Sequence, residues 1–238
     1  MTRSGRAVSH SAAGHLGSGV TARGAAVSTP ATVIVTLGIA AASWVVANRQ
    51  LSGMDMGVAT RLGSFGFFVA GWVLMMTAMM LPGAVPAVVR HAHANEQVRA
   101  VPVFVGSYLA VWTLVGLAVF ASYRPHGPVA AGVLAIAAGL YEVTPLKQRC
   151  RQRCRDTVGS GLEFGIYCVG SSIGLMVILT ALSVMSVGWM AIVAAVVVAQ
   201  KLVPPRVALD APLALAIIGL GVLIIVAPSS VPGLMPSM

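Results

Sequence analysis

Charged side chains are scarce in this sequence. Only 9% of its 238 residues are charged, and just six residues are acidic. A soluble domain of ordinary composition carries about 25% charged residues, so this chain has too few to cover a water-exposed surface. Hydrophobic residues make up 58% of the chain, and its mean hydropathy is +0.91. The composition therefore predicts an integral membrane protein.

Several sequence patterns are also missing, and each absence excludes a class of protein. No period-2 alternation of apolar residues marks a membrane β-barrel. No nucleotide-binding loop or phosphorylated-aspartate motif supports ATP-driven pumping, and no Ser-His-Asp or H-E-x-x-H pattern supports a hydrolase. The three cysteines form no disulfide framework. The net charge of +9 is better explained by membrane sidedness than by binding to nucleic acid.

What the sequence does contain is long apolar runs bounded by proline and glycine. Helices are the expected spanning elements, because lipid cannot satisfy backbone polar groups. The predicted fold class is all-α, a polytopic transmembrane helix bundle of about seven helices. The expected spans are 31–47, 62–81, 101–121, 128–146, 162–185, 187–203 and 211–228. The expected organisation is a disordered basic N-terminal tail (1–29), a transmembrane helical domain (30–230) and a short C-terminal tail (231–238).

The basic residues sort to alternate sides of these spans. Twelve of the fifteen lysines and arginines fall on the side of the N-terminal tail. Positive charge accumulates on the cytoplasmic side of membrane proteins. We therefore predict a plasma (inner) membrane protein with a cytoplasmic amino terminus and an external carboxy terminus.

Methionine is the first candidate ligand type. The stretch "GMDMG" places Met54, Asp55 and Met56 together on the predicted external side. The second span contains two i, i+4 methionine pairs, formed by Met75, Met76, Met79 and Met80. Thioether sulfur favours soft ions such as Cu(I), although methionine also serves as ordinary apolar filler. Both interpretations stay open.

The cysteines and one acid within a predicted span are further candidates. Cys150 and Cys154 share a face if "KQRCRQRC" is helical, and nearby cations favour the thiolate; metal binding, a redox or palmitoylation role, and no role are the alternatives. Cys168 lies inside the fifth span, where it is either a ligand or a small apolar residue. Glu142 is an intramembrane ionisable group, which suggests a functional site unless it pairs with Lys147.

Helical rise relates the depths of these residues. At about 1.5 Å per residue, the methionines of the second span, Glu142 and Cys168 all fall in the cytoplasmic half of the membrane. Their depths agree to within a turn or two. Equal depth permits one cluster without proving contact. His91 and His93 just inside the second span are either a chelating pair or solvated.

The motifs resemble a known family. The succession "W-x2-MM-x-AMMLP-x3-P", "YEVTPLK-x2-C-x3-CR" and "G-x6-C-x-G" before "GLM" resembles a bacterial family of unknown function whose members are predicted metal-binding integral membrane proteins, some labelled copper chaperones. The resemblance implies metal binding by methionine and cysteine, here Met54, Met56, Met75, Met76, Met79, Met80, Cys150, Cys154 and Cys168. Ser171 and Ser172 stand where the family usually has further cysteines.

The expected function is that of a membrane protein that handles a soft ion, Cu(I), in trafficking or transport. The expected partners are the lipid bilayer, the metal ion and a protein partner in metal handling. Two alternatives stay open, a non-catalytic assembly subunit whose methionines only pack helices, and a membrane thiol oxidoreductase using Cys150 and Cys154.

Overall fold

The computed structural model describes residues 29–51, 64–95, 100–124, 126–157, 159–182, 187–203 and 207–231. Within these residues the chain forms eight α-helices and one 3-10 turn, with no strand. The helices are α1 (Thr29–Leu51), α2 (Phe65–Asn95), α3 (Ala100–Ser122), α4 (Pro128–Glu142), α5 (Pro145–Asp156), α6 (Gly161–Leu182), α7 (Val187–Leu202) and α8 (Val207–Val226). The predicted all-α fold class is confirmed. The predicted tails lie almost entirely outside the described residues.

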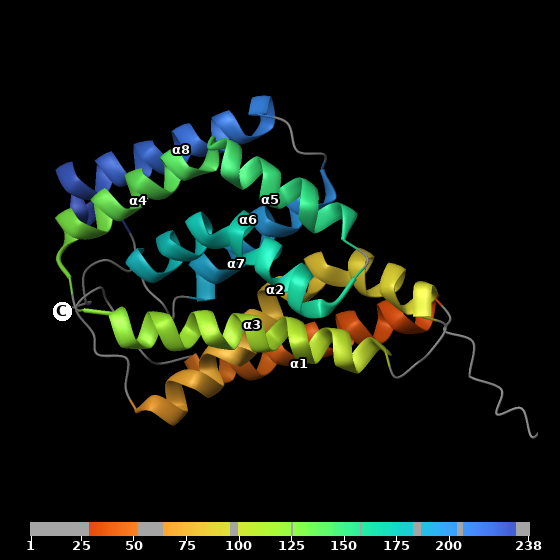
Figure 1. Cartoon of the computed structure of the whole chain (residues 1–238). Coiled ribbons are helices and arrows are strands. Elements are labelled where there is room, and N and C mark those ends of the chain that lie inside the picture. Colours follow the sequence, from red (N-terminus) through yellow and green to blue (C-terminus); the bar gives the residue numbers. More distant parts are fainter. Residues whose placement is uncertain are drawn as a thin grey trace, which may run out of the picture.

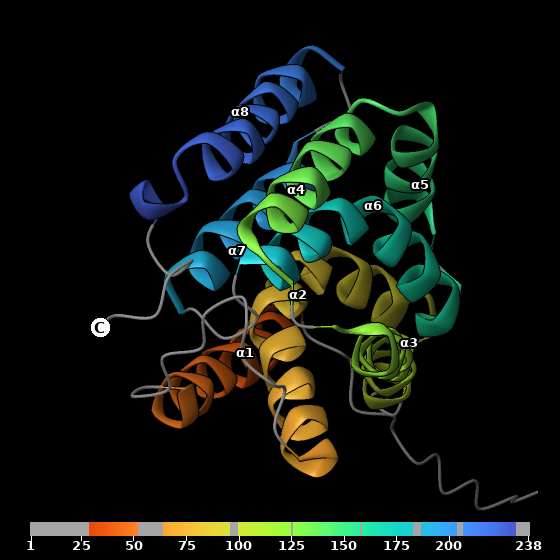
Figure 2. The same cartoon turned by 90° about the vertical axis from the view of Figure 1, so that its left-hand side faces the viewer.

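The helices stack in three layers (Figures 1 and 2). Helices α4 and α8 lie side by side on one face, α6 and α7 form the middle, and α1, α2 and α3 cover the other face. Helices α2 and α6 are the most buried of the candidate membrane spans. The middle of the bundle is therefore shielded on both sides by apolar helices.

Seven apolar helices occupy the positions of the seven predicted spans, and a polar helix, α5, stands where the sequence suggested a basic connection. Four helices (α1, α2, α3 and α6) are long and apolar enough to cross a membrane, or five spans if the α4–α5 pair, bent by 63°, counts as one. Helix α7 and the apolar stretch Asp210–Val226 of α8 are shorter than the four long spans. With six charged residues among twelve, α5 belongs outside the spanning segments.

Helix α2 continues through Pro82 and Pro86 to Asn95, whereas the expected span ends at residue 81. Proline has no N–H, so Pro82 leaves the carbonyl of Ala78, four residues back, without its helical donor. The indole Nε1 of Trp44 in α1 donates to that carbonyl at 3.0 Å. A neighbouring helix thus supplies the missing hydrogen bond. The methionine stripe, formed by Met75, Met76, Met79 and Met80, therefore remains on a continuous helix.

Glycines set the closest helix contacts. A Cβ on Gly161 would lie 2.0 Å from the backbone oxygen of Phe104 in α3, and one on Gly165 would lie 3.0 Å from Val111. Gly170 and Gly174 face α5 and α4 in the same way. These small residues therefore let α6 approach its neighbours closely.

The interface between α4 and α8 provides a test of this packing. A Cβ on Gly221 would lie 2.7 Å from the carbonyl oxygen of Gly132, whereas one on Gly219 meets nothing within 4 Å. We expect Gly221→Ala to destabilise the protein by about 1–3 kcal/mol through overpacking, lowering Tm by roughly 2–4 °C per kcal/mol. Thermal unfolding in detergent measures the effect. Gly219→Ala, on the same helix, is the control and should leave Tm unchanged or higher, so an equal loss in both would contradict the close approach.

Candidate metal centre

The amphipathic helix α5 is held against the bundle by buried charges. It begins at Pro145, after the N-cap Thr144, whose hydroxyl accepts from the Lys147 backbone N–H. Arg151 donates to Asp210 of α8 at 2.7 Å and to the carbonyl of Gln200 in α7. Both side chains of that ion pair are at least 96% buried. Ion pairing therefore compensates the desolvation of a charged helix.

The two cysteines of α5 face α6, as the spacing of four predicted. The sulfur of Cys150 lies against Gly170, where a Cβ would come within 2.6 Å of it. One turn further along, Cys154 is buried and lies near Cys168, close enough for the two thiols to influence each other's ionisation. The fold thus pairs Cys154 with Cys168 rather than with Cys150.

Cys168 is fully buried and surrounded by polar and aromatic groups. The Nζ of Lys201 in α7 donates to its sulfur at 2.8 Å, and the hydroxyl of Tyr108 in α3 lies 3.3 Å from it. The same ammonium lies 5.9 Å from the ring centroid of Tyr108 and 5.5 Å from that of Phe164, within the range of cation–π attraction. Four helices (α3, α5, α6 and α7) therefore converge on this thiol pair.

The prediction that nearby cations hold the α5 cysteines as thiolates is wrong. Burial raises the pKa of Cys150. The hydrogen bond with Cys168, and then burial, raise the pKa of Cys154 despite the neighbouring Lys201 and Arg90. Desolvation of the charged form and donation to a sulfur acceptor outweigh the attraction of surface cations. Burial therefore favours the protonated thiol over the thiolate at both positions of α5.

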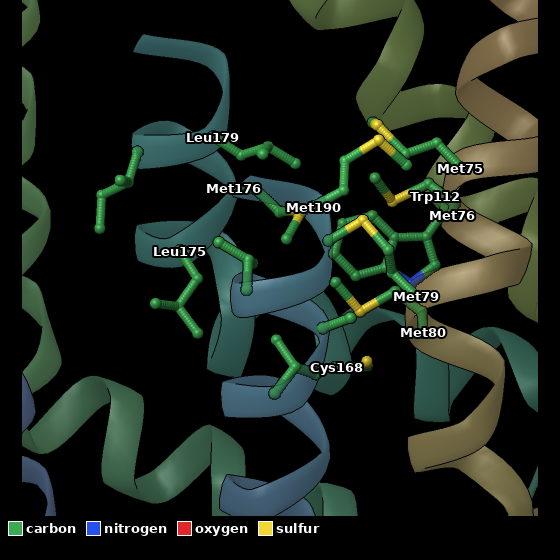
Figure 3. Packing of buried hydrophobic residues seen from close by; sticks show 14 of the residues in the cluster. Met75, Met76, Met79, Met80, Trp112, Cys168, Leu175, Met176, Leu179 and Met190 are labelled. Carbon is green, nitrogen blue, oxygen red and sulfur yellow. The ribbon is translucent and has the colours of Figure 1, made fainter. Parts of the chain in front are cut away.

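The methionine stripe lies wholly in the core. Figure 3 shows these side chains extending from α2 toward α6 and α7, with their sulfurs gathered there and Cys168 at one end of the group. Met176 of α6 and Met190 of α7 join them, and none of the six is more than 3% exposed: Met75, Met76, Met79, Met80, Met176 and Met190. The cluster therefore combines thioethers with the thiols of Cys154 and Cys168.

Glu142 occupies a different environment. It is fully buried and forms an ion pair with Lys147, the pairing that the sequence left open. Gln200 also donates to its Oε2 at 2.9 Å, while Oε1 has no partner among the described residues. These contacts join α4, α5 and α7 into one polar network. A metal-binding role for Glu142 stays a prediction.

Other candidates contribute less. Met54, Asp55 and Met56 lie outside the described residues. His93 forms a hydrogen bond with Thr29, whereas the ring of His91 packs against that of Phe104. The two imidazole rings therefore have different partners. In the part of the chain that the structure describes, no group of three or more His, Cys, Asp or Glu residues could hold a metal. The soft donors that the described residues bring together here are two thiols and the thioethers.

Sequence reasoning missed several neighbours of the thiol pair. Lys201 was counted only as a topological charge, although a lone lysine at the end of an apolar run is a sequence signal. The aliphatic stem of Lys201 passes over Gly83 of α2, where a Cβ would lie 2.6 Å from its Cδ. Tyr108, Met176 and Met190 gave no local signal, because each resembles ordinary helix filler.

Fold and site together define an apolar helical bundle with a buried thiol and thioether cluster. A protein-family model described as "PpoB2: Copper chaperone" matches residues 69–224. The chain therefore belongs to the PpoB2 copper chaperone family, and the resemblance inferred from the motifs is confirmed. No curated protein and no solved structure matches the chain.

The thiol contact is testable by oxidation. In a Cys150→Ser variant, diamide should convert Cys154 and Cys168 into an intramolecular disulfide, because the two thiols are near neighbours inside the bundle. Peptide mapping without reduction detects the bridge. The control is Cys154→Ser, in which the two remaining cysteines should stay as free thiols. A bridge between Cys150 and Cys168 in that control, formed equally fast, would contradict the pairing.

Proposed function

We propose that the chain binds Cu(I) between Cys154 and Cys168 and uses the buried methionines as additional soft ligands. The observation that carries this proposal is the proximity of two thiols from different helices, in one buried cluster with the methionines. Thiolate and thioether sulfur select Cu(I) over hard cations. Membership of a copper chaperone family supports the same ion.

Charge balance favours this arrangement. A Cu(I) ion bound by two thiolates carries one net negative charge, which is costly in an apolar interior. The ammonium of Lys201, 2.8 Å from Cys168, balances that charge. Copper binding then replaces the thiol protons, so affinity should fall as pH falls. Lys201 acts in this proposal as the counter-ion of the site.

The wider arrangement is also part of the proposal. The bundle lies in the plasma (inner) membrane with a cytoplasmic amino terminus, as the distribution of basic residues favours. Met54, Asp55 and Met56 receive the ion on the external side. The methionine stripe then leads toward the thiol pair near α5, from which a protein partner accepts copper.

Removing the thiol pair tests the copper site directly. In a Cys154→Ser, Cys168→Ser double variant we expect Cu(I) affinity to fall more than about 100-fold, or about 2.7 kcal/mol, because hydroxyls are poor ligands for a soft ion. Competition with a chromophoric Cu(I) chelator, under reducing and oxygen-free conditions, measures the affinity. Cys150→Ser is the matched control and should retain it. Equal affinities in all three chains would refute the site.

Replacing the methionine stripe separates copper handling from packing. Leucine conserves methionine's volume closely, so the variant with Met75, Met76, Met79 and Met80 changed to leucine should keep its Tm. If the sulfurs bind copper, the dissociation constant should rise by about tenfold, or about 1.4 kcal/mol. Unchanged copper affinity in a stable variant would instead favour an assembly subunit whose methionines only pack helices.

The thiol contact also supports a second candidate function, that of a membrane thiol oxidoreductase. The structure changes which pair would serve it, because Cys154 lies with Cys168 and not with Cys150. Added Cu(I) separates the two functions. If Cu(I) slows the alkylation of Cys154 and Cys168, copper binding is favoured. If Cu(I) has no effect on alkylation and a mixed disulfide with a partner can be trapped, redox chemistry is favoured.

A further inference from the structure

A second feature lies beside the thiol pair, on its exposed side. A pocket of about 350 Å³ opens between α2, α5, α6 and α7. Cys154 forms part of its wall, as do Arg90 of α2 and Arg155 of α5. The pocket is therefore a separate space that adjoins the candidate copper site.

The charges around this pocket are mostly positive. Arg90, Arg151, Arg155 and Lys201 line it, against one acidic residue, Asp156. Arg151 is neutralised by Asp210, and Lys201 is engaged with Cys168. That leaves Arg90 and Arg155 as the cations without a counter-ion, since Asp156 forms no ion pair with either one among the described residues.

A hydrogen bond links the side chain of one of these arginines to the backbone of the other. The Nη2 of Arg90 donates to the backbone carbonyl of Arg155 at 2.8 Å, which fixes α2 against the end of α5. The Nε of Arg90 and the Nη1 of Arg155 are buried atoms without a hydrogen-bond partner in the described part of the chain. Buried donors normally have partners, and like charges that line one pocket without counter-ions repel each other. A bound anion would accept hydrogen bonds from these donors and would balance the positive charge.

We propose that this pocket binds an oxyanion, phosphate or carboxylate, through Arg90 and Arg155. A guanidinium pair suits such groups because its N–H donors match the geometry of phosphate and carboxylate oxygens. The ligand lies against Cys154 and covers that thiol from water. This site is distinct from the proposed copper site. It does not depend on copper binding, because the copper ligands are sulfur atoms and the anion would be held by guanidinium groups.

Thermal unfolding of the purified full-length protein in detergent tests the pocket. Phosphate is titrated in place of chloride at constant ionic strength. We expect a saturating rise in Tm of roughly 5 °C, the size that ligand linkage gives for a chain of this length. Arg90→Gln and Arg155→Gln should each abolish the rise. Arg153→Gln removes an exposed arginine from the same helix as Arg155 and should keep it.

Further arms identify the source of the anion and guard against misfolded variants. Reconstitution in bilayers with anionic phospholipid, compared with neutral lipid, supports a headgroup source if the anionic bilayer alone raises Tm; a response only to soluble phosphate supports a free anion. In a Cys150→Ser chain with both arginines intact, phosphate should slow alkylation of Cys154 several-fold. The Cys154→Ser, Cys168→Ser chain should keep the Tm response even if copper binding fails.

The overturning results are specific. No saturating Tm rise with phosphate or with anionic lipid would refute the pocket. An equal rise in wild type, Arg90→Gln and Arg155→Gln would also refute it, because the response would then come from general screening. Unchanged alkylation of Cys154 at saturating phosphate would show that the anion binds elsewhere.

Discussion

The ion pair between Arg151 and Asp210 holds the candidate site together. It joins α5 to the start of α8, and the same guanidinium donates to backbone carbonyls at the end of α7. A helix with six charged residues has no apolar face large enough to dock by burial alone. Compensated charges therefore fix its position, and that position brings Cys154 to Cys168. The site thus depends on electrostatics that contribute nothing to metal coordination.

Two kinds of side chain surround the thiol pair, neutral thioethers and positively charged groups. On one side lie thioethers, which are neutral and cost little to bury, and on the other lie ammonium and guanidinium groups at the edge of the bundle. A soft monovalent cation is compatible with both, because sulfur binds it and the nearby positive charge balances two thiolates. A hard divalent ion would instead need oxygen ligands, and the described residues around the thiols offer few. The buried carboxylates of Glu142 and Asp210 are already paired with basic side chains.

Much of the fold followed from composition and hydrophobic runs. Seven apolar helices lie where the sequence placed them, because length and apolarity are local properties. The errors have physical causes. Pro82 did not end α2, since Trp44 from another helix supplies the hydrogen bond that proline removes. The sequence leaves the helical state of α5 open, because its charges resemble a topological signal until partners on α7 and α8 are known.

The sequence by itself determined which soft donor side chains the helices carry and their similar heights along those helices, since residue identity sets softness and helical rise sets height. It also predicted that Cys150 and Cys154 share a face if their segment is helical, and α5 is that helix. Only the tertiary structure decided that Cys154 meets Cys168, that Glu142 meets Lys147, and that Lys201 reaches the thiols across Gly83. The reason is that contacts between helices depend on the rotation and neighbours of each helix, which the spacing of residues along one helix does not contain.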